Sequence, residues 1–105
     1  MKARTERSKR YESKNFFYWW DVSPNHPQKR KGEEGIRFLK RDSNDFCEVS
    51  FQELKPYLIK ARRSSRSQRT WGVKVLKDRP NELAFKPPSG SEDWKYLKVE
   101  WRQNT

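Results

Sequence analysis

Phe16–Val22, with the sequence FFYWWDV, places five aromatic residues in succession inside a chain that is otherwise strongly polar. Aromatic side chains favour strands, and Pro24 follows the run as a turn signal, so we expect a strand over these residues. Because side chains alternate between the two faces of a strand, five consecutive rings do not fit one interior face. We therefore predict that most of the rings form a core, and that at least one of Tyr18, Trp19 and Trp20 is exposed for stacking on nucleobases.

The composition limits the size of this core. A chain of 105 residues and 12.8 kDa matches one small domain. Only 31% of the residues are hydrophobic, 37% are charged, and the mean hydropathy is −1.33, values that are typical of disorder when aromatic residues are absent. Here five Trp, four Tyr and six Phe are present, and each buries about 150–250 Å² when enclosed. We therefore expect a thin aromatic core in a single small domain over residues 15–105.

Two shorter strand signals follow the aromatic run. Residues 36–40 (IRFLK) alternate imperfectly between apolar and polar side chains, and we expect them to pair with the strand at Phe16–Val22. The sequence DSND at residues 42–45 is typical of a turn, and residues 46–49 form a short strand signal directly after it.

A helix is predicted over about residues 51–63. Ser50 and Glu53 have the Ser-x-x-Glu spacing of a capping box, in which the two residues satisfy free amide groups at a helix start. Pro56 conflicts with a long helix, since a proline beyond the first turn costs about 3 kcal/mol. The sequence therefore predicts either a kink at Pro56 or a start near Lys55.

Three alternating segments close the chain, at residues 70–77, 82–86 and 94–101, and they predict an antiparallel meander. In the last of them the alternation changes phase near Tyr96 and Leu97. Together these signals predict an α+β fold: a small antiparallel β-sheet, or a partly closed barrel, of five to six short strands with one helix. Residues 1–14 have no apolar period, so we expect a flexible basic arm there.

The surplus positive charge lies in two segments. The formal net charge is +11; residues 2–14 hold six basic and two acidic residues, and residues 60–69 hold five basic residues and no acid. Such blocks are typical of polyanion-binding segments, because each phosphate that a Lys or Arg neutralises adds salt-dependent affinity. We predict a non-enzymatic protein that binds nucleic acid, DNA or RNA, through its phosphates. The predicted contacts are Arg4, Arg7, Lys9, Arg10, Lys29, Arg30, Lys31, Lys60, Arg62, Arg63, Arg66 and Arg69.

Two alternatives use other residues. The aromatic residues 16–20 could instead form the surface of a protein-interaction module that recognises an acidic or modified partner. Glu53 and Lys55, with Asp42 or Asp45 upstream, have the composition of a metal-dependent nuclease site. A Glu-x-Lys triplet is expected by chance in so charged a chain, so we predict no catalytic residue, no metal and no cofactor.

Cellular location follows from two further signals. Cys47 is the only cysteine, so no disulfide forms within the chain, and this favours a reducing compartment. No apolar run approaches the roughly 18 residues of a membrane span. We expect an intracellular protein, cytoplasmic or nuclear, without a membrane partner. The sequence leaves open whether the nucleic acid is single- or double-stranded.

Overall fold

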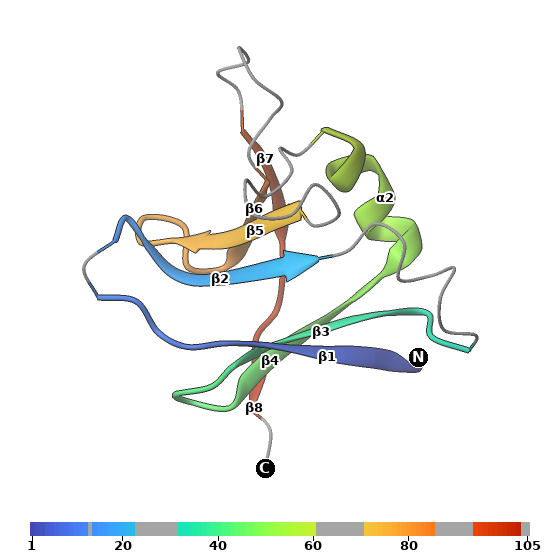
Figure 1. Ribbon diagram of the computed structural model, residues 1–105, viewed down its shortest axis with the longest axis horizontal. Helices are drawn as coiled ribbons and strands as arrows, with labels where there is room; N and C mark the ends of the chain where they lie inside the picture. Colours follow the sequence, from blue (N-terminus) through green and yellow to red (C-terminus); the bar gives the residue numbers. More distant parts are fainter. Residues whose placement is uncertain (13, 23–31, 61–70, 86–93, 104–105) are drawn as a thin grey trace.

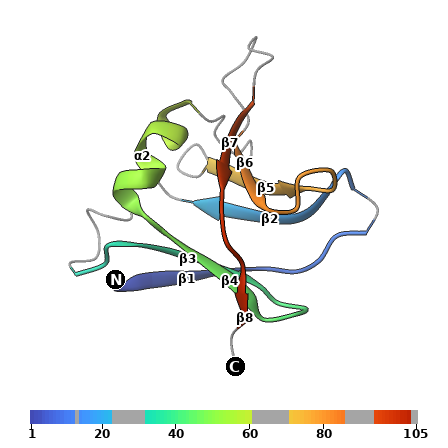
Figure 2. The same cartoon turned by 180° about the vertical axis from the view of Figure 1, so that it is seen from behind.

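The computed structural model describes residues 1–12, 14–22, 32–60, 71–85 and 94–103. Its strands form two four-stranded sheets that lie one above the other, and the helix covers one end of the sandwich (Figure 1). Figure 2 shows the same two layers from behind, with the chain crossing between them near its C-terminus. Over the described residues the fold is therefore small and mostly β with one helix, which agrees in part with the predicted α+β class. The described strands number eight instead of five to six, and they form two open sheets and no closed barrel.

The first sheet has the strand order β1-β3-β4-β8. Its middle strands β3 and β4 are antiparallel, β8 is antiparallel to β4, and β1 runs parallel to β3. The bounds are β1 (Ala3–Ser8), β3 (Gly35–Lys40), β4 (Asp45–Ser50) and β8 (Arg102–Gln103).

The expectation of a flexible arm over residues 1–14 is wrong for β1. This strand pairs with β3 along its whole length, from Ala3 opposite Gly35 to Ser8 opposite Lys40. An edge strand needs only one neighbour with free backbone groups, so a polar sequence suffices. Ser8 is buried, and its Oγ accepts a hydrogen bond of 3.0 Å from the backbone amide of Trp19 in β2, which ties β1 to the other sheet.

The second sheet has the order β2-β5-β6-β7 and is antiparallel throughout. It confirms the strand at Phe16–Val22 and the closing meander. The predicted pairing of residues 36–40 with the aromatic strand is wrong, because β3 lies in the other layer and faces β2 across the core. The bounds are β2 (Phe16–Val22), β5 (Trp71–Leu76), β6 (Glu82–Phe85) and β7 (Lys95–Lys98).

Large rings fill the space between the sheets. Trp20 of β2 is 2% exposed and meets Phe38 of β3 edge to face, with 5.3 Å between ring centroids. Tyr18 and Trp101 both stack with Trp20, with 5.9 Å and 6.2 Å between ring centroids. Because each ring buries about 150–250 Å², these few residues supply much of the apolar burial in a chain with few aliphatic side chains.

Helix α2 (Phe51–Lys60) begins with the predicted capping box. The backbone amide of Glu53 donates to Ser50 Oγ at 3.0 Å, and the Ser50 hydroxyl donates to Glu53 Oε1 at 3.0 Å. The helix therefore begins at Phe51 and not near Lys55, and it keeps Pro56 in its interior at the cost of one backbone hydrogen bond. Residues 61–63, the predicted end of the helix, lie outside the described residues.

Residues 94–101 do not form the single strand that the sequence predicts. β7 pairs with β6 in the second sheet, whereas β8 pairs with β4 in the first, so the chain changes layers between them. The Trp101 indole donates to the carbonyl of Pro80 at 2.8 Å and fixes this crossing. The change of phase at Tyr96 and Leu97 therefore precedes a crossing between layers.

Candidate nucleic-acid interface

The basic side chains predicted to contact phosphate are described for the N-terminal segment only. Arg4 forms an ion pair with Glu6 at 3.0 Å, and Arg10 forms one with Glu12 at 2.7 Å. Arg7 and Lys9 are exposed. The side chains of the other predicted contacts lie outside the described residues: Lys29, Arg30, Lys31, Lys60, Arg62, Arg63, Arg66 and Arg69.

The N-terminal basic residues do not form one patch. Arg4 is opposite the core residue Ile36 and so lies on the inner face of β1, whereas Arg7 is opposite Leu39 and lies on the outer face. Lys9 and Arg10 come after the end of the strand. The basic side chains of the arm that we predicted at residues 1–14 are therefore distributed over two faces and one end of the first sheet.

The second sheet brings together the attachment points of two basic segments. Val22, the last residue of β2, pairs with Trp71, the first residue of β5. Residues 23–31, which contain Lys29, Arg30 and Lys31, therefore leave the sheet beside the point at which residues 61–70 enter it. Both segments are joined to the framework at the end that also carries α2 (Figure 1).

The first sheet brings the N-terminus to this same end. The backbone amide of Glu34 donates to the carbonyl of Lys2 at 2.7 Å, and Ala3 is opposite Gly35 in the parallel pairing of β1 with β3. Lys31 is bonded directly to Gly32, and a Cβ atom on Gly32 would lie 3.6 Å from Lys2 Nζ. The start of the N-terminal segment is therefore close to Gly32, the described residue that follows the Lys29–Lys31 cluster in the sequence.

Of the three predicted stacking residues, two are core residues. Tyr18 is 3% exposed and Trp20 is 2% exposed, so neither offers a ring face to a ligand and the prediction is wrong for both. Trp19 is half-buried on the opposite face of β2. Its indole lies over Gly72 of β5, where a Cβ would come within 3.2 Å of Trp19 Nε1.

Trp19 belongs to a row of residues that crosses the outer face of the second sheet. The pairings are Trp19 with Lys74, Lys74 with Ala84, and Ala84 with Tyr96, which gives one residue from each of the four strands. Directly paired residues share a face of the sheet. A register shift in β2 between Phe16 and Tyr18 turns the Phe16 ring to this side, where it meets Trp19 at 5.9 Å.

Cations cover the edges and faces of these rings. Lys74 Nζ lies 4.8 Å from the centroid of Phe16 and 5.6 Å from that of Trp19. The Arg79 guanidinium lies 3.9 Å from the centroid of Tyr96. The Tyr11 ring meets Phe16 at 5.1 Å, and Phe16 itself is buried. We call this side of the sheet, made of Tyr11, Phe16, Trp19, Lys74, Arg79, Trp94 and Tyr96, the aromatic face.

A hollow of about 460 Å³ opens beside the aromatic face. Trp94 and Tyr96 supply its rings, and Lys77 supplies a cation; the remaining lining residues are Asn15, Leu76 and Asp78. Sequence reasoning did not single out Trp94 or Tyr96 as functional. The signal was available in the alternation of residues 94–98 (WKYLK), which sets two rings on one side of the strand.

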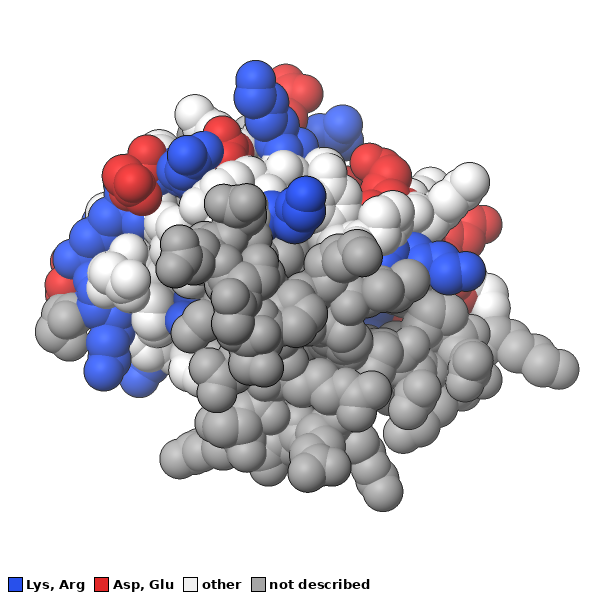
Figure 3. Space-filling view, turned by 90° about the horizontal axis from the view of Figure 1, so that it is seen from above, with Lys and Arg blue, Asp and Glu red and all other residues white. Residues whose placement is uncertain are grey.

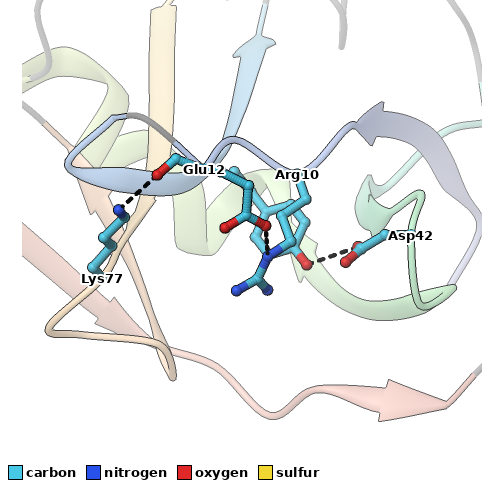
Figure 4. Close-up of polar contacts among 5 residues, drawn as sticks. Arg10, Glu12, Asp42 and Lys77 are labelled. Atoms are coloured by element: carbon cyan, nitrogen blue, oxygen red, sulfur yellow. Dashed lines mark hydrogen bonds and ion pairs between the residues drawn. The ribbon is translucent and has the colours of Figure 1, made fainter.

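Lys and Arg side chains lie around much of the described surface. Figure 3, which looks down on the second sheet, shows several at the left, where Figure 1 has the connection from β1 to β2 and the turn from β5 to β6, and others at the top and right with Asp and Glu among them. Polar contacts hold this connection in place (Figure 4): Lys77 donates to the carbonyl of Glu12 at 2.9 Å, and Arg10 donates to the Glu12 carboxylate at 2.7 Å. Beside it, the Tyr18 hydroxyl of β2 donates to Asp42, which follows β3, at 2.7 Å. Burial, followed by this hydrogen bond to Asp42, raises the pKa of Tyr18.

Lys40 lies beside the same cluster. Its Nζ is 4.0 Å from the centroid of Trp101 and 5.1 Å from that of Tyr18, and burial lowers the pKa of its ammonium group. The ammonium is therefore held by ring faces at the edge of the core, with Asp45 and Asp42 nearby and partly offsetting the effect of burial.

The residues of the nuclease alternative are not brought together. Glu53 lies in the first turn of α2, after the end of β4, and its carboxylate is used in the capping box. Asp42 and Asp45 lie at the other end of β4, a distance of about 17–20 Å for a strand of six residues. Within the described ranges, no group of three or more His, Cys, Asp or Glu side chains could hold a metal ion. Cys47 is buried, which raises the pKa of its thiol to about 12.

Comparisons with known proteins give no relative: no protein-family model, no curated protein and no solved structure matches this chain. No helix in the described part of the chain has both the length and the apolar composition needed to cross a membrane.

Proposed function

We propose that this protein binds nucleic acid without catalysing a reaction, and that it contacts phosphates through the basic segments at residues 2–14 and 60–69, with Lys29, Arg30 and Lys31 as a supplementary contact. The formal net charge of +11 supports an anionic ligand. Residues 60–69 contain no acid to neutralise their five cations within the segment, and a block of like charge favours a partner of opposite charge.

The observation that carries this proposal is the common attachment of two basic segments. Val22 is paired with Trp71, so residues 23–31 and 61–70 are joined to the framework at one end of the sandwich. The hydrogen bond from Glu34 to Lys2 brings the start of the N-terminal segment to that end, whereas β1 carries Lys9 and Arg10 to the other end. Cations that share one end of a small domain raise the local potential together, and a polyanion that contacts one of the two segments is then within reach of the other.

A salt titration tests the proposal. On duplex DNA the logarithm of the affinity should fall by about 0.9 for each phosphate contacted, per unit of the logarithm of salt concentration. Replacing Arg62, Arg63, Arg66 and Arg69 by Ala should weaken binding and reduce this slope. The matched control replaces four exposed cations elsewhere, Lys55, Lys95, Lys98 and Arg102, and removes the same formal charge. Equal effects of the two quadruple variants would reduce the proposal to a nonspecific consequence of net charge.

The two alternatives have less support. Tyr18 and Trp20 are buried, so an interaction module built on residues 16–20 would have to use Trp19 and its neighbours. The carboxylates of the nuclease alternative lie at opposite ends of β4. We therefore expect purified protein to cleave neither DNA nor RNA in Mg²⁺ or Mn²⁺, and cleavage that Glu53→Gln abolishes would reverse this ranking.

A further inference from the structure

The aromatic face offers rings and cations in a pattern that the basic segments do not have. We infer that this face binds unpaired bases of a single-stranded nucleic acid by stacking, and that the hollow between Trp94, Tyr96 and Lys77 receives one of them. The inference rests on the proposed function, which gives nucleic acid as the ligand. It adds a second binding surface and a single-stranded form of that ligand.

Ring chemistry favours bases as the occupant. Trp94 and Tyr96 are both half-buried and line the hollow together, and the stacking of a base on an aromatic side chain is sequence-tolerant, since every base has a π-face. Bases in a duplex already stack on one another, so their faces are not available to such a hollow. Only an unpaired base enters it.

Charge complementarity selects a polyanion over an apolar ligand. Lys74, Lys77 and Arg79 all lie within the aromatic face or line its hollow. Glu82 is paired with Arg79 at 3.2 Å, and Asp78 lines the hollow. Asp78 and Asn15 place one carboxylate and one amide at its wall, groups that can hydrogen-bond the edge of a base.

The dimensions of the row match a short stretch of single strand. Trp19 and Tyr96 are separated by three inter-strand spacings of about 4.8 Å, or about 14 Å in all. At a rise of about 3.4 Å per nucleotide in a stacked strand, this distance spans a few nucleotides. The row across the sheet and the hollow at its edge therefore serve one continuous ligand.

The test compares single- and double-stranded DNA of the same sequence. The probe is a fluorescein-labelled oligonucleotide of about 12 nucleotides, within the roughly 4–16 that a small single-strand-binding domain covers, alone or annealed to its complement. The variants are Trp94→Leu and Tyr96→Leu, which remove one ring each and keep apolar bulk. Phe46→Leu is the matched control, because Phe46 is a half-buried ring with Arg37 over it at 4.8 Å, on the first sheet. Urea unfolding confirms that each variant is folded.

We expect Trp94→Leu and Tyr96→Leu each to weaken single-strand binding about fivefold or more, the loss of one stacked base. Duplex affinity and the Phe46→Leu variant should stay within about twofold of the unaltered protein. Unchanged single-strand affinity in both ring variants would overturn the inference, as would an equal loss on duplex.

The Arg62, Arg63, Arg66 and Arg69 quadruple variant separates this inference from the proposed function. If that variant weakens binding to both strand forms while the ring variants are neutral, the proposed function stands and the inference fails. If the ring variants weaken single-strand binding while the quadruple variant binds normally, the inference stands and the phosphate contacts at residues 60–69 fail. Absence of binding to either probe at about 50 mM salt overturns both.

Discussion

The two faces of β2 carry similar aromatic side chains in different surroundings. On the inner face Tyr18 and Trp20 are almost fully buried and stack on each other, and Trp20 also stacks on Trp101. On the outer face Phe16 and Trp19 are covered by the Lys74 ammonium instead of by another sheet. Strand alternation and one register shift therefore divide a single aromatic run into rings that pack between the sheets and rings on the outer face, where Trp19 is half-buried and Phe16 is buried beside it.

The comparison shows why the number of aromatic residues does not predict a binding surface. A ring packed against other rings contributes apolar burial to the core. A ring covered by a cation instead lies next to a positive charge that also attracts a phosphate. The same substitution on the two faces should therefore change different measured quantities, the free energy of unfolding on the inner face and ligand affinity on the outer face.

The largest effect is expected for Trp20→Ala. Removing this fully buried ring should lower the free energy of unfolding by about 3–5 kcal/mol, measured by urea denaturation. Trp19→Ala, its neighbour on the outer face, should cost less than half as much, because that ring is only half-buried. Equal losses from the two variants would show that both faces of β2 are core and would end the distinction.

The pH dependence of stability tests the burial of Cys47, which lies in β4 of the first sheet. Burial raises the pKa of Cys47 to about 12 from an ordinary value of 9.0, so the folded state keeps a proton that the unfolded state loses above about pH 9. Stability from this group is therefore complete below pH 9 and is lost as the pH rises toward about 12.

Relative to Cys47→Ala, the unaltered protein should lose on the order of 1–2 kcal/mol more between pH 8 and pH 10.5, measured by urea unfolding at each pH. Subtracting the variant removes the contributions of Lys and Tyr titration common to both. Parallel pH profiles for the two proteins would indicate that the thiol is ionisable in the folded state.

The smallest expected effect belongs to Lys74→Ala on the outer face. An ammonium over rings at the protein surface contributes about 0.5–1 kcal/mol to stability, so urea unfolding should change little. In single-strand binding, one phosphate contact fewer should reduce the salt slope by about 0.7. Lys55→Ala on α2 removes the same charge from an exposed site and should leave the slope unchanged; a matching decrease there would argue against a localised contact.

Sequence reasoning succeeded where a signal is local. The strand at Phe16–Val22, the capping box of Ser50 and Glu53, and the antiparallel meander all follow from neighbouring residues. It failed for β1, whose polar sequence has no apolar period, because this edge strand is held chiefly by backbone bonds to β3, which any sequence can make. The partner of β3 was also missed, since two apolar strands are equally suited to pair in one sheet or to face each other across a core.

The candidate site was predicted less well than the fold. Alternation predicted that the rings at residues 16–20 divide between faces, but their assignment depends on a register shift beside Phe16 that the sequence does not mark. Trp94 and Tyr96 lie on the same face as Trp19 only because β5 and β6 pair between their strands. Such pairing between distant parts of the chain is not visible in a local sequence pattern. Described basic residues such as Arg4 and Arg10 are paired with acids close by, so a linear count of charge overstates what they offer to phosphate.

The central claim is that nucleic acid is the ligand and that its phosphates are held by the basic segments. The most direct test is the affinity of the unaltered protein for matched single- and double-stranded DNA at about 50 and 200 mM salt, by fluorescence anisotropy. The account predicts binding to both forms at the lower salt, a clear loss at the higher salt, and tighter binding of the single strand. An affinity that does not change between the two salt concentrations, or no binding at either, would contradict it.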